Sequence, residues 1–350
     1  MSAIYSVATN FPDIYVSQEE IMKEIASLWP DKKSYVEQFH NASQVNGRHL
    51  SIPLEKYKSL GDVGERSKRW LEVALALQTI NVQNLLNQAG LKPSDISLIA
   101  TTTVTGLAIP TLEARLMNKL PFKENTKRLP IFGLGCLGGV AGINRVNDYL
   151  KGHPKEAALL LASELCTLTF QFQDKSVANL VGTSLFADGT AAVLMVGEEH
   201  PLYKDSQFQI LAGESYFYPN TERIMGWDLV SSGFQIVLSG DVPKIVEEKV
   251  KPNLEDFLSG KKLTGSDINF MVSHPGGPKV LDKLSEISGK APEEFKHSWT
   301  SLREKGNMSS VSVLHVLEKT IADKKARNEI GLMLAMGPAF CSEMALIKKL

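Results

Sequence analysis

The chain has 350 residues, of which 43% are hydrophobic and 22% are charged, and its formal net charge is −1. This composition is that of an ordinary globular protein, with enough residues for one large domain or two smaller ones. A net charge so near zero provides no general attraction to nucleic acid or to an anionic membrane, so we expect neither as a partner.

The cysteines and the apolar segments indicate the location of the protein. Its three cysteines, Cys136, Cys166 and Cys341, are too few and too scattered for a disulfide framework or a metal site. No apolar run approaches the ~18 residues needed to span a bilayer, and the N-terminus lacks the basic segment and apolar core of a secretory signal. We therefore expect a cytoplasmic protein with no integral membrane segment and no bound metal.

The expected elements alternate between helices and apolar strands. The first half should contain a long helix ending before Gly90, a strand after Asp95, a helix from Pro110, a strand before Gly133, a helix after Cys136 and a strand from Ala158. The second half should contain a helix kinked by Pro252, a strand after Asp267, a helix from Pro278, a helix after Asn307 and a strand from Gly331. Near-continuous apolar strands between helices predict sheets covered on both faces.

The two halves of the chain repeat one another. Four consecutive features recur 168 to 173 residues apart, namely Asp95 and Asp267, Pro110 and Pro278, Cys136 and Asn307, and Ala158 and Gly331. An ordered set of matches at nearly one separation predicts an internal duplication. We therefore expect an α/β fold of two pseudo-symmetric halves, residues 1–205 and 206–350. Cys136 and Asn307 would then begin the central helices of their halves, where both can contribute to one site.

The segment "GLGCLGG" (residues 133–139) permits two interpretations. It fits the dinucleotide-binding pattern G-x-G-x-x-G between a strand and a helix, and Glu164 lies near the place of a ribose-binding acid. A lone match is weak evidence, and the equivalent "GNMSS" has no such glycines. Alternatively, Cys136 is a nucleophile, because a helix N-terminus stabilises a thiolate. Its base and polar orienting group would be His274 and Asn307.

These three residues carry a family resemblance. Cys136 in "GLGCLGG", His274 in "HPGGP" and Asn307 in "GNMSS", with "LVGTSLFADGTAAVLMVG" from Leu180, resemble a type III polyketide synthase, a chalcone-synthase-like member of the thiolase superfamily. "TLEARLMNKLPF" and "LCTLTFQ" are most similar to bacterial alkylpyrone synthases. The resemblance covers nearly the whole chain. It implies a five-layer αβαβα fold from two duplicated halves, in agreement with the repeat.

The resemblance also implies a reaction. Cys136 would carry the acyl chain as a thioester, and His274 would stabilise its thiolate. His274 and Asn307 would donate hydrogen bonds to the malonyl thioester oxygen as decarboxylation gives an enolate. The substrates would be acyl-CoA and malonyl-CoA, and the condensation requires no redox cofactor.

Further residues acquire expected roles from the same resemblance. Phe186 matches an aromatic gate between the CoA tunnel and the cavity, and Ile236 stands where plant members have a second gate phenylalanine. The aliphatic side chain favours a long fatty acyl starter and alkylpyrone products. The expected cavity residues are Thr169, Ser309 and Trp227, the last at a place where some members have glycine. Ile109 matches a loop that crosses the family's dimer interface, which implies a homodimer, and Arg48 is a candidate for binding CoA.

Three other functions remain open from the sequence. A β-ketoacyl-ACP synthase III-like enzyme of fatty-acid synthesis would use the same three residues but carrier-protein thioesters. A nicotinamide-dependent dehydrogenase would use the glycine pattern and would bind NAD. A catalytically silent acyl-binding protein would need no reactive thiol at Cys136.

Overall fold

The computed structural model describes residues 1–323 and 325–350. Its largest feature is a nine-stranded mixed sheet with the order β11-β12-β13-β8-β1-β7-β6-β4-β5. The first half of the chain contributes β1 (Ser2–Asn10), β4 (Ile96–Thr103), β5 (Lys127–Phe132), β6 (Ala157–Leu165) and β7 (Asp188–Gly197). The second half contributes β8 (Phe208–Phe217), β11 (Phe270–Ser273), β12 (Ile330–Gly337) and β13 (Cys341–Lys349).

The strand order confirms the predicted duplication. Followed outward from the centre, β1-β7-β6-β4 in the first half matches β8-β13-β12-β11 in the second. In each half the outermost of these pairs is parallel and the others are antiparallel. Three residue pairs between β1 and β8 join the halves, so that one sheet runs through both. The division into domains at residue 205 stays a prediction.

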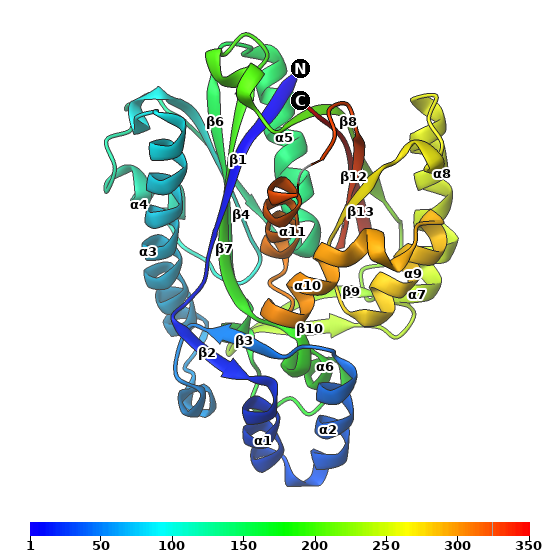
Figure 1. Cartoon of the computed structure of the whole chain (residues 1–350). Helices are drawn as coiled ribbons and strands as arrows, with labels where there is room; N and C mark the ends of the chain where they lie inside the picture. The colour runs from blue at the N-terminus through cyan, green and yellow to red at the C-terminus, as the bar shows by residue number, and fades with distance from the viewer. Residues whose placement is uncertain (324) are drawn as a thin grey trace.

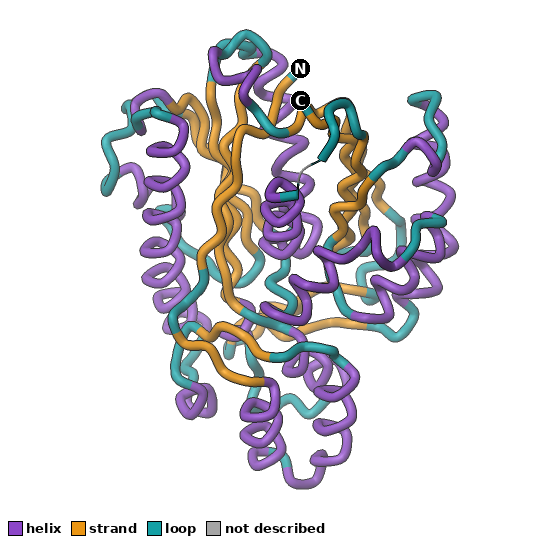
Figure 2. The backbone as a smooth tube through the Cα atoms, in the orientation of Figure 1, coloured by secondary structure: helices purple, strands orange, loops and turns teal. Residues whose placement is uncertain are grey.

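The helices complete the five layers (Figures 1 and 2). α5 and α11 lie between the two halves of the sheet, α3 and α4 cover the outer face of the first half, and α8 and α9 cover that of the second. The bounds are α3 (Val63–Ala89), α4 (Leu112–Met117), α5 (Gly138–Gly152), α7 (Val242–Ile245), α8 (Lys251–Gly260), α9 (Pro278–Ser288), α10 (Lys296–Lys305) and α11 (Ser310–Ala322). Within the described chain, no helix combines the length and apolarity that crossing a bilayer requires.

A group of smaller elements lies at one end of the sheet, at the bottom of Figure 1. It consists of β2 (Ile14–Ser17), α1 (Gln18–Leu28), α2 (Lys33–Ala42), β3 (Gly47–Leu50), α6 (Val177–Leu185), β9 (Met225–Val230) and β10 (Gly233–Leu238). β2 pairs with β3, and β9 pairs with β10, both antiparallel. These elements form much of the cavity walls described below.

Two of the predicted helix features are confirmed in detail. α3 ends at Gly90, whose φ of 65° is left-handed and suits glycine, and Asp62 caps its start. The helix of the second half is interrupted where Pro252 was expected to kink it. A π-helical segment, Val246–Val250, separates α7 from α8 there. Pro252 has no N–H and its ring clashes with the carbonyl four residues earlier, so a wider turn relieves the conflict.

The two central helices pack closely at their N-terminal ends. Their predicted apolar faces are completely buried, namely Val140, Ile143 and Val146 of α5 and Val311, Leu314 and Leu317 of α11. Gly139 makes the close approach possible. A Cβ atom there would lie 2.5 Å from the backbone oxygen of Ser310 and 2.6 Å from Val313 Cγ1. Any side chain at position 139 would push the two helix starts apart.

We therefore expect Gly139→Ala to destabilise the protein, although alanine favours a helix. The overlap with α11 should reduce the free energy of unfolding by about 1–3 kcal/mol, as overpacking of a core does. Gly152→Ala is the matched control in the same helix, because a Cβ atom there would meet nothing within 4 Å. Urea unfolding of the two variants measures the difference. Equal stability would contradict the proposed role of the close approach.

Candidate active site

Cys136 and Asn307 lie at the starts of the two central helices, as the repeat predicts. Cys136 is in a 3₁₀ turn, Gly135–Leu137, directly before α5, and Asn307 precedes α11. Burial raises the pKa of Cys136, and hydrogen bonds from the side chains of Ser309 and Asn307 partly oppose this rise. The site is therefore assembled from both halves of the chain.

The glycines beside Cys136 shape the turn. Gly135 has a φ of 52°, which glycine adopts without strain. A Cβ atom there would also lie 2.6 Å from Cδ of Pro338. Glycine is thus required at position 135 for backbone and packing reasons, without reference to a bound phosphate.

The amide group of Asn307 is held in one orientation. Its Oδ1 accepts a hydrogen bond from the backbone N–H of Ser309 at 2.8 Å, and its Nδ2 donates to the backbone oxygen of Gly276 at 3.1 Å. Nδ2 carries two protons, so the one that is not donated to Gly276 can serve Cys136 or a ligand oxygen. Ser309 has a left-handed φ of 48°, a conformation that costs about 1–3 kcal/mol in a non-glycine residue.

His274 follows β11 and faces the same cavity as Cys136 and Asn307. It is only 3% exposed, and neither ring nitrogen has a hydrogen-bond partner among the described residues. Burial lowers the pKa of His274 to about 3, so the imidazole is neutral near pH 7. A buried polar group without a partner is unfavourable, which indicates that a polar ligand atom completes this site.

The thiol of Cys136 is also uncharged near neutral pH. Burial raises its pKa to about 12, against the opposing hydrogen bonds of Ser309 and Asn307. Glu164 contributes a smaller rise because its carboxylate lies close by. Near neutral pH the site therefore holds a thiol at Cys136 and a neutral imidazole at His274.

Glu164 is a buried, hydrogen-bonded carboxylate and not an exposed ribose ligand. Ser310 and Thr105 donate their hydroxyls to it at 2.7 and 2.8 Å, and the backbone N–H of Val104 donates at 3.1 Å. Burial raises the pKa of Glu164 to about 7 in spite of these donors. The residue joins β6 of the first half to the start of α11 in the second.

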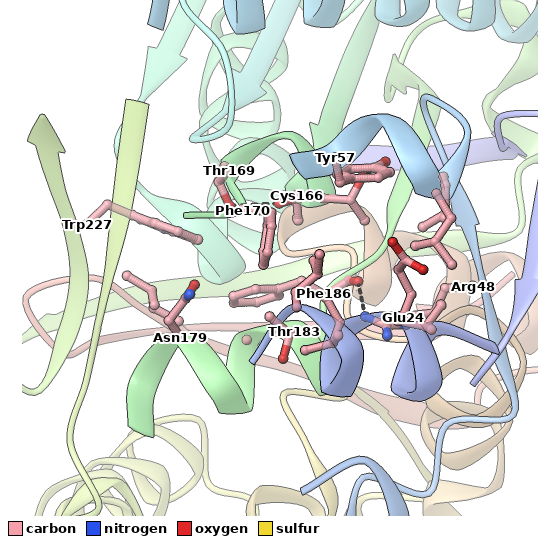
Figure 3. Close-up of a pocket in the computed structure, with 18 residues that line it drawn as sticks. Glu24, Arg48, Tyr57, Cys166, Thr169, Phe170, Asn179, Thr183, Phe186 and Trp227 are labelled. Atoms are coloured by element: carbon pink, nitrogen blue, oxygen red, sulfur yellow. Dashed lines mark hydrogen bonds between the residues drawn. The ribbon is translucent and has the colours of Figure 1, made fainter. Parts of the chain in front are cut away.

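The site opens into two adjacent cavities. The front cavity is lined by Cys136, His274, Asn307 and Ser309, among others. The rear cavity is the smaller of the two and extends toward α1, with Trp227 at one end of the labelled side chains and Glu24 and Arg48 at the other (Figure 3). Its wall is mainly apolar. Four residues line both cavities: Gly182, Phe186, Trp227 and Ile236.

The other residues singled out from the sequence fall into distinct places. Thr169 and Cys166 line the rear cavity only. The Phe186 ring packs against Trp227 with centroids 5.6 Å apart, and Trp227 is the cross-strand partner of Ile236 in the β9–β10 hairpin. These three residues together form a partition between the cavities.

Two residues lie away from the front cavity. Ile109 is 97% exposed on the loop after β4 and lines neither cavity. Arg48 does not suit the expected binding of CoA, and this interpretation is corrected. Its side chain is 2% exposed and donates to the carbonyl of Phe186 at 2.7 Å and to Oε1 of Gln18 at 3.0 Å. A guanidinium held inside the protein cannot contact the phosphates of a ligand at the surface.

The structure adds cavity residues that the sequence did not indicate. α1 contributes Ile21, Glu24 and Ile25 to the rear cavity, and Lys279 lies on the front cavity wall. The i, i+4 spacing of Ile21 and Ile25 predicts a buried helix face but does not reveal what it faces. Gly182 resembles any other small residue in the sequence. Lys279 directly follows "HPGGP", and this adjacency in the sequence does indicate a position near the site.

Comparisons with known proteins agree with this geometry. The model for the C-terminal domain of chalcone and stilbene synthases matches residues 209–350, and that for FAE1/type III polyketide synthase-like proteins matches residues 36–212. The chain is 38% identical to 1,3,6,8-tetrahydroxynaphthalene synthase of Streptomyces peucetius subsp. caesius, over 99% of this chain and 93% of that protein. It is 35% identical to a putative chalcone synthase of Bacillus subtilis (strain 168), over 99% and 98%.

A solved structure gives the same result. The crystal structure of 1,3,6,8-tetrahydroxynaphthalene synthase from Streptomyces coelicolor A3(2) matches with a TM-score of 0.93 at 28% sequence identity, covering 99% of each chain. The thiolase-like fold that the family resemblance implied is thereby confirmed. The chain belongs to the type III polyketide synthases, acyltransferases that condense malonyl-CoA with an acyl-CoA.

Proposed function

We propose that Cys136, His274 and Asn307 carry out the condensation, with Cys136 as the nucleophile. The observation that supports this assignment is the meeting of Cys136 with Asn307 and Ser309 across the two helix starts, beside a buried imidazole without a protein partner. In the loading step, the thiol proton moves to His274 as the sulfur attacks the acyl-CoA carbonyl. The CoA thiolate leaves and takes up that proton, and the acyl group remains on Cys136.

Extension uses the same polar groups in a second role. Malonyl-CoA loses CO₂, and negative charge develops on its thioester oxygen as the enolate forms. The remaining Nδ2 proton of Asn307 and an N–H of His274 stabilise that charge, and they act strongly because the site is buried. The enolate carbon attacks the thioester carbonyl on Cys136, a C–C bond forms and the bond from that carbonyl to sulfur breaks. The released Cys136 thiolate takes up one proton from solvent, because its thiol proton left with CoA during loading. The product is a β-ketoacyl-CoA, which can be loaded again.

This sequence of steps is redox-neutral. It moves protons and acyl groups and releases CO₂, but transfers no hydride or electron. The proposed reaction therefore needs no nicotinamide, flavin or metal ion, and CoA thioesters enter as substrates only.

We favour a long-chain acyl-CoA starter and cyclisation to alkylpyrones. The rear cavity has a mainly apolar wall and is separated from Cys136 by a partition in which Ile236 is aliphatic. An apolar chamber is where an alkyl chain gains the most from leaving water. A second candidate is an aromatic product built from malonyl units, since the Streptomyces peucetius relative is named for 1,3,6,8-tetrahydroxynaphthalene. The two candidates differ in the starter.

Mass spectrometry of products separates these candidates. Purified protein would receive malonyl-CoA alone or together with acyl-CoAs of graded length. We expect alkylpyrones from long starters and no chain extension by Cys136→Ala, because the variant cannot hold the acyl group. Products from malonyl-CoA alone would favour the second candidate. Turnover with carrier-protein thioesters but not with CoA thioesters would instead support the β-ketoacyl-ACP synthase alternative.

We expect the alkylation rate of Cys136 to rise with pH between about 5 and 9. Burial raises the pKa of Cys136 to about 12 and lowers that of His274 to about 3, so His274 stays neutral over this range and the thiolate forms only by loss of the thiol proton. The thiolate population, and with it the rate, should therefore grow about tenfold per pH unit. Burial raises the pKa of Glu164 to about 7, and its negative charge disfavours the thiolate, so the rise should be less steep where Glu164 ionises.

Iodoacetamide labelling of Cys136 across this range, followed by mass spectrometry, tests this expectation. Glu164→Gln should make the rise uniform through pH 7. His274→Gln should leave the pH dependence unchanged, because a neutral imidazole carries no charge that acts on the thiol. A rate independent of pH in the unaltered protein would contradict the expectation and would show that Cys136 and His274 share a proton as a thiolate–imidazolium pair.

We propose that the protein is a homodimer joined through the face that carries Ile109. The chain exposes Leu107, Ile109, Leu129 and Phe132 on this loop and on the edge strand β5. Neighbouring exposed apolar side chains on an unpaired strand favour a partner surface. In sedimentation velocity we expect a dimer for the unaltered protein and a shift toward monomer for Ile109→Asp. A monomeric unaltered protein would refute the proposal.

A further inference from the structure

Gly182 occupies the passage between the two cavities. It lies within α6 and is one of the four residues that line both the front and the rear cavity. Glycine inside a helix is about 1 kcal/mol less favourable than alanine. The φ of Gly182 is not left-handed, so the backbone does not demand glycine there. The reason for glycine must lie in what surrounds it.

The ring of Phe186 lies against the place where a side chain at position 182 would begin. A Cβ atom on Gly182 would be 3.3 Å from Cδ2 and 3.4 Å from Cε2 of Phe186, and 3.7 Å from Cδ1 of Ile236. Phe186 follows the last turn of α6, and its ring folds back over that turn. Glycine lets the ring rest against the helix, and a methyl group would lift it away.

The backbone around Phe186 cannot yield to relieve such a contact. The N–H of Phe186 donates to the carbonyl of Gly182 at 3.0 Å, and Arg48 donates to the carbonyl of Phe186 at 2.7 Å. Leu185 and Ala187, on either side, form backbone hydrogen bonds of 2.7 and 2.9 Å with Asn307. The ring must therefore move instead of the backbone.

The ring's other neighbours are the remaining members of the partition. Phe186 packs against Trp227, and Trp227 pairs with Ile236 across the hairpin. A methyl group on residue 182 would occupy space between Phe186 and Ile236 and displace the ring from the helix. Both the added methyl group and the displaced ring narrow the opening between the two cavities.

We propose that Gly182 sets the width of the passage and thereby the length of acyl chain that the enzyme accepts and builds. This inference rests on the proposed function of the front cavity as the condensing site and of the rear cavity as the chamber for the chain. It assigns Gly182 as a specificity-determining residue that takes no part in the chemistry.

Gly182→Ala and Gly182→Val test this inference, with Gly152→Ala as the matched control. Gly152 also lies in a helix, α5, but it lines neither cavity and a Cβ atom there would meet nothing within 4 Å. Intact-protein mass spectrometry would follow loading of Cys136 from acetyl-CoA and from acyl-CoAs of increasing length. Product mass spectrometry with malonyl-CoA would give the longest chain built.

We expect Gly182→Ala to load acetyl-CoA within about twofold of the unaltered rate and long acyl-CoAs at least about tenfold more slowly, a difference of about 1.4 kcal/mol in the barrier. Gly182→Val should reduce long-chain loading further, and the products of both variants should be shorter. Gly152→Ala should change neither property. The melting temperature of Gly182→Ala should equal or exceed that of the unaltered protein, because alanine favours the helix.

Three results would overturn the inference or its basis, and they can be told apart. Unchanged chain-length dependence in both Gly182 variants would show that the passage is not limiting. Equal loss of short and long starters would show that position 182 affects the catalytic residues and not the passage. If the unaltered protein loads no acyl-CoA of any length, the proposed function itself fails.

Discussion

The active site depends on one contact, the approach of the α5 start to the α11 start. Each half of the chain supplies one of these helices, and Gly139 against the backbone of Ser310 sets how closely they lie. Only at that spacing do Ser309 and Asn307 reach the thiol of Cys136. A side chain at position 139 would press on the backbone of Ser310 and separate the nucleophile from the groups that orient it. The duplication therefore creates the site through its packing geometry.

The approach of the two helix starts also explains how buried, uncharged groups can support a reaction with charged intermediates. The N-terminal ends of α5 and α11 both lie at the region of Cys136, where the positive ends of the helix dipoles favour negative charge. Burial keeps His274 and Cys136 neutral at rest. Charge then forms only when a substrate is present to receive the proton or the hydrogen bond. Glu164 nearby is held by several donors, and these limit the effect of its charge on the thiol.

Sequence analysis predicted the duplication and the meeting of Cys136 with Asn307, because helical periodicity and the spacing of repeated features can be read directly from the sequence. It could not predict the burial of Arg48, since a basic residue beside a glycine looks the same whether it lies on the surface or inside. The contributions of α1 and of Gly182 to the cavities were also missed. Their neighbours in space, such as Ile236 and Trp227, are distant in sequence. A glycine within a helix does not reveal in the sequence that an aromatic ring packs against it.

Backbone hydrogen bonds join the partition between the cavities to the catalytic site, and this limits which changes in the passage the enzyme can tolerate. Asn307 forms its backbone hydrogen bonds to the residues on either side of Phe186, so a shift of that segment would also move the catalytic amide. Arg48 holds the same segment from the other side. The shape of the passage can therefore change without loss of catalysis only through side chains, at Gly182, Trp227 and Ile236. Differences in product length within such a framework are expected to arise at these three positions, while the backbone that carries Phe186 stays constant.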